Sequence, residues 1–154
     1  FKNEGFLILE VICNSVRETK NFASGLSKKF QKGQVIALNG DLGSGKTTFS
    51  QGIAEGLGIE QHVGSPTFKL VSEYSGEILR LYHVDCYRLN NSDEFLNLGG
   101  ENLLLPDNGI TLIEWANIIQ ELVPEDVIEI VFSRVKGEPN KRLLKIRGMD
   151  QSNE

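Results

Sequence analysis

The chain has 154 residues and a formal net charge of −5, and 40% of its residues are hydrophobic and 24% are charged. This length and composition support one globular domain with a buried core, and they exclude an intrinsically disordered protein and a pair of ordinary domains. The acidic balance disfavours a protein that grips nucleic acid by its phosphates, and no apolar run reaches the length of a membrane-spanning helix.

The N-terminal third predicts strands that alternate with helices. A first strand is expected at residues 7–13. A capping box follows, in which the Ser15 hydroxyl accepts from the backbone N–H of Glu18 and the Glu18 side chain reaches back. The spacing of apolar residues then predicts a helix to about Phe30. Residues 35–38 form a continuous apolar run, which is typical of a strand buried on both faces.

A second helix is expected from about Lys46 to Leu57, and after it the pattern becomes rich in strands. Residues 68–74 and 78–85 predict a half-exposed antiparallel hairpin. Further elements are expected at residues 92–94 (the start of a short helix), 110–113 (a buried strand), and 127–135 with 143–147 (a closing hairpin). We therefore predict a three-layer α/β fold of the P-loop NTPase type, on a mixed sheet with antiparallel hairpins. Residues 1–154 are expected to form one domain, with a disordered tail over 148–154.

Between the first buried strand and the second helix lies a complete phosphate-binding motif, G-x-x-x-x-G-K-[ST]. Its residues are Gly40, Asp41, Leu42, Gly43, Ser44, Gly45, Lys46 and Thr47. Glycines let the backbone come close to a phosphate, and successive N–H groups point inward at the positive end of the following helix. We expect Lys46 to contact the outer phosphates from the solvent side, and the Thr47 hydroxyl to bind Mg²⁺.

Phosphoryl chemistry also needs a carboxylate beside the metal, usually at the tip of a strand next to the loop. Two candidates are Asp85, which follows residues 81–84, and Glu114, which follows residues 110–113. The second strand looks more buried, which favours Glu114. Aspartate is the commoner residue beside a metal, which favours Asp85. The residues leave this choice open, and the alternative for either is a carboxylate that caps a neighbouring helix.

The loop Ser65-Pro66-Thr67 is a further candidate. A hydroxyl there could reach Mg²⁺ or the γ-phosphate, as switch segments do, or the segment could be a proline-fixed turn that leads into a strand. Trp115 is expected in the core, as a large aromatic residue usually is. No Asn-Lys-x-Asp element, which usually reads guanine, follows in the sequence, so ATP is favoured over GTP.

Two other features give weaker indications. Six basic residues and a single acidic one, Glu138, stand between residues 134 and 147. This pattern predicts either a solvated edge hairpin or a docking face for an acidic partner or RNA. The two cysteines, Cys13 and Cys86, have neither a CxxC nor a metal-ligand spacing, so we expect buried free thiols in a reducing cytoplasm.

Four motifs, taken together and in order, resemble the bacterial TsaE (YjeE) family of small ATPases. They are residues 40–49 (GDLGSGKTTF), 65–67 (SPT), 83–89 (HVDCYRL) and 112–115 (LIEW). The likeness runs from about residue 19 to residue 147 and is far more specific than the phosphate-binding motif alone. It implies an ATPase that acts with Mg²⁺ and serves the formation of threonylcarbamoyladenosine in tRNA. Its implied partners are two paralogous proteins, TsaB and TsaD, of which TsaD carries the transferase chemistry while the ATPase cycle resets or regulates the complex.

By position, the resemblance implies roles for individual side chains. Lys46 and Thr47 match the family's phosphate and Mg²⁺ residues. Asp85 and Glu114 both match acidic positions tied to the metal, so the two carboxylates share the site. Thr67 matches a switch-like residue that also faces the metal.

The resemblance also implies where the rest of the nucleotide lies. Thr19, on the first helix, matches a threonine placed near the base. The other nucleotide-binding candidates are Gly40, Asp41, Gly43, Ser44, Gly45 and Thr48. Cys86 stands where relatives often carry an apolar residue, and we expect no effect on the chemistry. The acidic net charge suits a protein that leaves tRNA contacts largely to its partners.

Two other functions stay open from the sequence. Many short P-loop chains phosphorylate metabolites, but Arg80 and Arg88 are the only mid-chain arginines and no arginine-bearing lid segment is present. A nucleotide-gated binding module with negligible turnover would instead use the loop as a switch. Formation of ADP by the chain alone, with metabolites and with partner proteins distinguishes the three functions.

Overall fold

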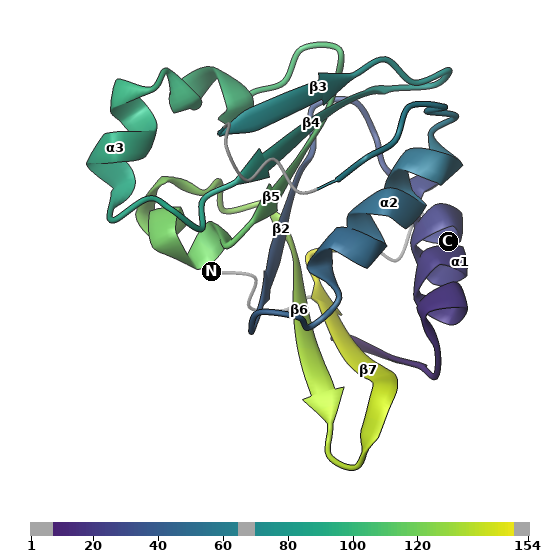
Figure 1. The fold of residues 1–154 in the computed structure, drawn as a ribbon. Coiled ribbons are helices and arrows are strands. Elements are labelled where there is room, and N and C mark those ends of the chain that lie inside the picture. The colour runs from purple at the N-terminus through teal and green to yellow at the C-terminus, as the bar shows by residue number, and fades with distance from the viewer. Residues whose placement is uncertain (1–7, 65–69, 150–154) are drawn as a thin grey trace.

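The computed structural model describes residues 8–64 and 70–149, which form one seven-stranded mixed sheet with helices on both faces (Figure 1). In chain order the elements are β1 (Leu9–Cys13), α1 (Val16–Ser27), β2 (Val35–Gly40), α2 (Lys46–Gly56), β3 (Val71–Tyr74), β4 (Arg80–Asp85), α3 (Ser92–Asn97), the 3-10 helix η1 (Gly100–Leu104), β5 (Gly109–Glu114), the 3-10 helix η2 (Ala116–Leu122), β6 (Ile128–Val135) and β7 (Glu138–Arg147). The predicted α/β fold on a mixed sheet is confirmed.

The sheet has the strand order β1-β7-β6-β2-β5-β4-β3. Its four central strands β6, β2, β5 and β4 are parallel, whereas β6–β7, β1–β7 and β3–β4 pair antiparallel. Strand β2 lies in the middle, with residues 35–38 at most 5% exposed, which confirms the expected fully buried strand. The carboxyl ends of parallel strands meet at one edge of a sheet. Gly40, Asp85 and Glu114, the last residues of β2, β4 and β5, therefore lie at the same edge.

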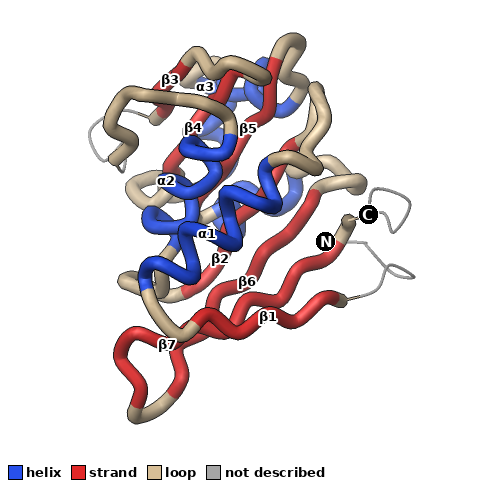
Figure 2. The backbone as a smooth tube through the Cα atoms, turned by 90° about the vertical axis from the view of Figure 1, so that its right-hand side faces the viewer, coloured by secondary structure: helices blue, strands red, loops and turns tan. Residues whose placement is uncertain are grey.

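Alternating side chains of the central strands bury two cores, one on each face of the sheet. Ile36 and Leu38 of β2 point to the core beneath α1 and α2, the pair that Figure 2 shows lying together across one face of the sheet. Val35 and Ala37 point to the opposite core, which α3, η1 and η2 help to cover. A strand that must fill two cores carries no polar residue on either face, which explains the continuous apolar run in β2.

Helix α1 begins as predicted but ends earlier. The Ser15 hydroxyl accepts from the Glu18 N–H at 3.1 Å, whereas the Glu18 carboxylate reaches back to the N–H of Asn14 rather than to that of Ser15. The helix ends at Ser27 because the next residues donate to carbonyls three positions back, which forms a tighter turn. Phe30 is buried in the core but lies beyond the helix.

The basic hairpin does not lie at the edge of the sheet, so that part of the prediction is wrong. Strand β1 pairs with residues 142–146 of β7 and is itself the edge strand. Only the hairpin turn projects from the sheet (Figures 1 and 2). Of the expected tail, Gly148 and Met149 are described, and Met149 packs against the core beneath α1 and α2.

Both cysteines are buried free thiols, as predicted. Burial raises the pKa of Cys86 to about 12, and burial also raises the pKa of Cys13. Both therefore stay protonated at neutral pH and are poor nucleophiles and metal ligands. Within residues 8–64 and 70–149, no helix is long and apolar enough to cross a membrane.

Helices α1 and α2 approach closely at two glycines of α2, Gly52 and Gly56. A Cβ built on Gly52 would lie 2.6 Å from the Lys20 carbonyl oxygen and 2.7 Å from the Ala23 Cβ, both on α1. Gly25 of α1 is different, because a Cβ built there meets nothing within 4 Å. The close approach of the helix that follows the phosphate-binding motif thus depends on Gly52 and Gly56 having no side chain.

We expect Gly52→Ala to lower the free energy of unfolding by about 1–3 kcal/mol, because the added methyl group forces the two helices apart. Gly25→Ala is the matched control, and it should raise the free energy of unfolding by up to about 1 kcal/mol, since alanine favours the helix. Urea unfolding followed by circular dichroism measures both. Equal stabilities for the two variants would contradict the packing described here.

Candidate functional site

The predicted phosphate-binding loop connects the carboxyl end of β2 to the first turn of α2. Gly40, Gly43 and Gly45 have φ values of +151°, +74° and +106°, a backbone conformation that residues other than glycine rarely adopt. Helix α2 starts at Lys46, directly after the loop, so its free N–H groups and the positive end of its dipole face the same space. The local structure is thus the one that the motif needs to hold an anion.

Lys46 lies across this loop rather than in solvent. Its ammonium group donates to the carbonyl oxygens of Gly40 and Asp41, the latter at 2.9 Å, and lies 4.1 Å from the centroid of the Trp115 ring. The residue is only 5% exposed, so the expectation of a solvent-side lysine is wrong. Burial lowers the pKa of Lys46, although the nearby carboxylates of Glu114, Asp85 and Asp41 partly offset this effect.

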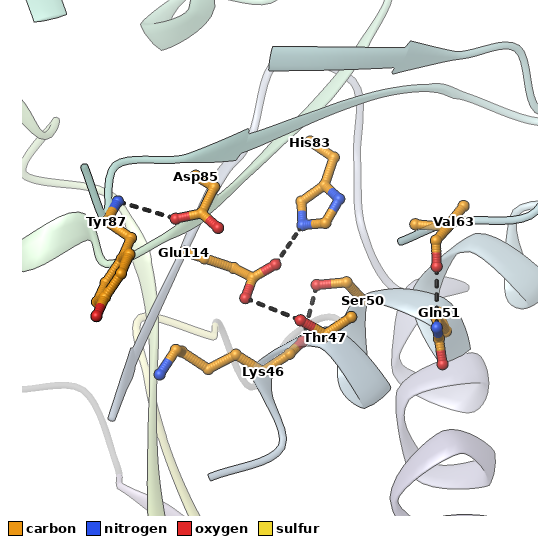
Figure 3. Close-up of polar contacts among 9 residues, drawn as sticks. All are labelled: Lys46, Thr47, Ser50, Gln51, Val63, His83, Asp85, Tyr87 and Glu114. Carbon is orange, nitrogen blue, oxygen red and sulfur yellow. Dashed lines mark hydrogen bonds and ion pairs between the residues drawn. The ribbon is translucent and has the colours of Figure 1, made fainter. Parts of the chain in front are cut away.

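The two candidate carboxylates stand side by side on neighbouring parallel strands, because Asp85 of β4 is in register with Glu114 of β5 (Figure 3). Glu114 is 3% exposed, and its Oε1 accepts from the Thr47 hydroxyl at 3.3 Å. Asp85 is half-buried, and its Oδ1 accepts from the backbone N–H of Tyr87 at 2.9 Å. Both predicted acidic residues thus face the loop, and Glu114 directly contacts the threonine expected at the metal.

His83 was not singled out from the sequence, yet it holds Glu114. Its Nε2 lies 2.5 Å from Glu114 Oε2, and because a carboxylate only accepts, the imidazole donates. The ring is fully buried, and its Nδ1 has no hydrogen-bond partner. Glu114 is therefore fixed from two sides, by the Thr47 hydroxyl and by the His83 ring.

Lys46, Thr47, Asp85 and Glu114 border one cleft of about 430 Å³. Its lining residues are Leu42, Gly43, Gly45, Lys46, Thr47, Thr48, Asp85, Tyr87, Glu114, Trp115 and Arg142. A volume in this range suits a small-molecule ligand. On one side of the cleft lie the Lys46 ammonium group and the backbone N–H groups of the loop, and on the other side lie the carboxylates of Asp85 and Glu114. This arrangement suits a phosphate chain with a divalent cation.

The other predicted site residues have different positions. Gly40, Asp41 and Ser44 belong to the loop but do not line the cleft. Thr19 is 2% exposed on α1, where its hydroxyl donates to the Ser15 carbonyl at 3.2 Å, and it does not line the cleft either. Thr67 and its neighbours fall outside the described residues.

The sequence analysis missed or misplaced four lining residues, which are Leu42, Tyr87, Trp115 and Arg142. Trp115 was expected in the core, but it borders the cleft, with its ring centroid 5.0 Å from that of Tyr87. Its φ of +58° is the only positive value at a non-glycine residue in the described part of the chain. Arg142 comes from β7, and its Nε donates to the Ser44 carbonyl at 3.0 Å. A signal for Trp115 existed, since it directly follows Glu114, but nothing near Arg142 in the sequence connects it to the loop.

The oxygen donors at the cleft fit magnesium better than a transition metal. Among the described residues, no group of three or more histidine, cysteine or acidic side chains could enclose a metal ion. Magnesium does not need such a group, because it is usually held by one or two carboxylates, water and the phosphates of its nucleotide. The Thr47 hydroxyl with Glu114 and Asp85 is a donor set of this kind.

The chain is similar to known proteins over most of its length. The sequence model of the family described as "Threonylcarbamoyl adenosine biosynthesis protein TsaE" matches residues 13–143. A relative from Bacillus subtilis (strain 168), named tRNA threonylcarbamoyladenosine biosynthesis protein TsaE, is 44% identical over 117 residues, which are 76% of this chain and 72% of the relative. A relative of the same name from Treponema pallidum is 33% identical over 88% of this chain and 98% of its own length.

The fold is also similar to a solved structure. The crystal structure of Bacillus subtilis YdiB superposes with a TM-score of 0.74 and 34% sequence identity, and the match covers 96% of this chain and 90% of that one. Sequence and structure comparisons therefore point to the same group of proteins over most of the chain.

Proposed function

This chain belongs to the TsaE family of threonylcarbamoyl adenosine biosynthesis proteins, and we propose that its part in that process is to bind and hydrolyse ATP. The observation that carries this proposal is the contact between Thr47 and Glu114 at the end of a complete phosphate-binding loop. It brings a hydroxyl and a carboxylate, the usual oxygen ligands of magnesium, to the edge of the space that the loop N–H groups face.

The proposed roles follow from chemistry and position. Lys46 and the N–H groups of Gly43 and residues 45–48 would neutralise the β- and γ-phosphates. Thr47 and Glu114 would hold Mg²⁺ directly, and Mg²⁺ supplies charge neutralisation of the phosphates when it is bound. Asp85, beside them, would act next to the metal and activate the attacking water. We further propose that Thr19 lies near the base and that Thr67 reaches the metal, as the resemblance implies. The absence of an Asn-Lys-x-Asp element supports ATP over GTP.

We propose that TsaB-like and TsaD-like proteins are the partners, with tRNA contacted mainly through them. Two large side chains are exposed at the rim of the cleft, Leu42 at 67% and Tyr87 at 50%, where a partner would cover them. Arg142 lines the cleft, but its donors bind backbone carbonyls, so we propose that a partner supplies the arginine that contacts the γ-phosphate. A role in tRNA modification also favours the cytoplasm as the compartment.

We expect the isolated chain to hydrolyse ATP slowly and the TsaB–TsaD pair to accelerate it, by about 10³-fold or more if the partner supplies an arginine to the γ-phosphate. By linkage, ATP should strengthen partner binding by the factor by which the partners strengthen ATP binding. Phosphate release during titration of the purified partners measures the first effect, and partner affinity with ATP, with ADP and without nucleotide measures the second.

The control for this experiment is the same partner mixture with Lys46→Ala, which should show no stimulated release. Hydrolysis that the partners leave unchanged, together with an affinity that is independent of nucleotide, would contradict the proposal. ATP consumption that required a metabolite instead would identify a small-molecule kinase.

A further inference from the structure

Two arginines of the β6–β7 hairpin bind backbone carbonyl groups of the phosphate-binding loop. Arg142 donates from Nε to the Ser44 carbonyl at 3.0 Å and from Nη2 to the Gly43 carbonyl at 3.2 Å. Arg134 donates from Nη2 to the Leu42 carbonyl at 2.8 Å. Two guanidinium groups thus bind three consecutive carbonyl oxygens of the loop, although they lie more than 85 residues away in the sequence.

We propose that Arg134 and Arg142 are positioning residues that orient the phosphate-binding loop for nucleotide binding, an inference that rests on the proposed ATP site. The physical reason lies in the planar trans peptide, in which the C=O and the following N–H point in opposite directions. When the arginines bind the carbonyls of Leu42 and Ser44, the N–H groups of Gly43 and Gly45 point away from these guanidinium groups. Both of these glycines line the cleft.

The N–H between these two, that of Ser44, has a different function. It donates to the Asp41 carbonyl at 3.1 Å and so closes the turn of the loop itself. Of the three peptide groups that the arginines bind, one thus closes the turn, and the other two carry the N–H groups of Gly43 and Gly45 at the cleft. A guanidinium on a carbonyl also polarises the peptide and makes its N–H a stronger donor, since linked hydrogen bonds strengthen one another.

The arrangement of the two arginines in the sheet supports a dedicated role. Arg134 and Arg142 are directly opposite each other in the β6–β7 ladder, where like charges normally destabilise a sheet. Both guanidinium groups donate to backbone carbonyls. Besides its bonds to the loop, Arg142 donates from Nη1 to the carbonyls of Pro139 and Lys141 at 2.7 and 2.9 Å. Its planar group is therefore fixed on two sides.

The loop is shaped to receive these side chains. Gly43 has a φ of +74°, and a Cβ built on it would clash with the guanidinium of Arg134. The glycine thus serves two purposes, since it permits the backbone turn and leaves room for the arginine. The positive charges of Arg134 and Arg142 next to the loop also add to the electrostatic potential that attracts a polyphosphate.

The test compares four variants, Arg142→Ala, Arg142→Lys, Arg134→Ala and a control, in nucleotide titrations by calorimetry, with steady-state kinetics in the presence of the partners. We expect Arg142→Ala to raise the Kd for both ATP and ADP by about tenfold or more, because weakened loop donors lose charge-assisted hydrogen bonds to phosphate. KM should rise while kcat at saturation changes little. Arg142→Lys should recover only part of the affinity, because an ammonium group lacks the planar fork that binds two carbonyls.

Lys145→Ala is the matched control, because it removes one positive charge from the same strand without touching the loop. Lys145 is half-exposed and lies 3.9 Å from Glu10. The Lys145→Ala variant should have the same nucleotide Kd and the same KM for ATP as the unmodified chain. Full recovery by Arg142→Lys, or an equal loss in Lys145→Ala, would show that charge alone matters and would overturn the inference.

The kinetic split and the folding controls separate the remaining outcomes. A fall in kcat with unchanged KM would identify Arg142 as a group on the γ-phosphate rather than a positioning residue. Wild-type affinity in Arg142→Ala and in Arg134→Ala would overturn the inference while leaving the ATP site intact. An unmodified chain that bound no nucleotide would overturn the proposed function as well. Circular dichroism and Tm confirm that each variant is folded, and should Arg142→Ala be unfolded, the Arg142→Lys and Arg134→Ala titrations decide.

Discussion

Replacing Lys46 by alanine is expected to weaken ATP binding by about 100-fold or more and to abolish measurable hydrolysis. The ammonium group would make at least two charge-assisted contacts with the outer phosphates. Each hydrogen bond of a charged group contributes about 1.5–3 kcal/mol, and two of them correspond to about 100-fold or more in Kd. Calorimetric titration with ATP in the presence of Mg²⁺ measures the loss directly, and phosphate release measures turnover.

The fold should survive this substitution even though Lys46 is buried. Burial lowers the pKa of its ammonium group, so the folded chain holds that charge at a cost which alanine removes. The ammonium group lines the cleft, so water can enter the space it leaves and bind the carbonyls of Gly40 and Asp41. We expect a change in unfolding free energy of less than about 1 kcal/mol. Lys32→Ala, at an exposed lysine in a turn, is the control, and wild-type ATP affinity in Lys46→Ala would show that the loop is not the site.

Glu114→Gln and Asp85→Asn are expected to impair hydrolysis in different ways. Glu114 contacts Thr47 and is buried, so losing its charge should raise the Mg²⁺ concentration needed for half-maximal ATP binding by at least about tenfold. Asparagine at position 85 keeps an oxygen that accepts the Tyr87 N–H. Asp85→Asn should therefore spare ATP binding and lower kcat by about 100-fold, the size of effect of a lost group that activates water.

Titrations with Mg²⁺ at fixed ATP, followed by single-turnover hydrolysis, separate these two roles. Both substitutions preserve side-chain volume, so differences in packing do not enter the comparison. Full activity in either variant removes that residue from the site. The opposite pattern, with Mg²⁺ dependence shifted only in Asp85→Asn, would assign direct metal contact to Asp85 instead.

The sequence predicted those parts of the site that depend on residues close together in the chain. The loop, Lys46 and Thr47 form one continuous segment, whose glycines and helix start follow from local geometry. Asp85 and Glu114 were identified because each ends an apolar strand, and parallel strands bring such ends to one edge. The sequence did not decide which of the two carboxylates lies at the metal, because their separate contacts depend on side-chain positions.

Other parts depend on tertiary structure and could not be derived from local patterns. Arg142 reaches the loop only because β7 pairs with β6 and β6 pairs with β2, an order that periodicity does not reveal. The basic hairpin was expected at an edge because lysines on an edge strand block pairing, and local patterns did not reveal that β1 pairs with β7. The contact between His83 and Glu114 depends on the register of β4 against β5, which the alternation of residues along one strand does not reveal.

The position of β2 in the sheet also has a consequence for the order of synthesis. Its two neighbours, β5 and β6, are translated after it, so the strand that leads into the nucleotide loop emerges from the ribosome with no partner on either side. Pairing between segments so far apart in the chain forms late, because the loops between them must close first. The arginine contacts to the loop wait longer still, until the last hairpin has been made. A nascent or truncated chain that ends before β6 therefore carries the whole phosphate-binding motif, yet it lacks one neighbour of β2 and both arginines that bind the loop.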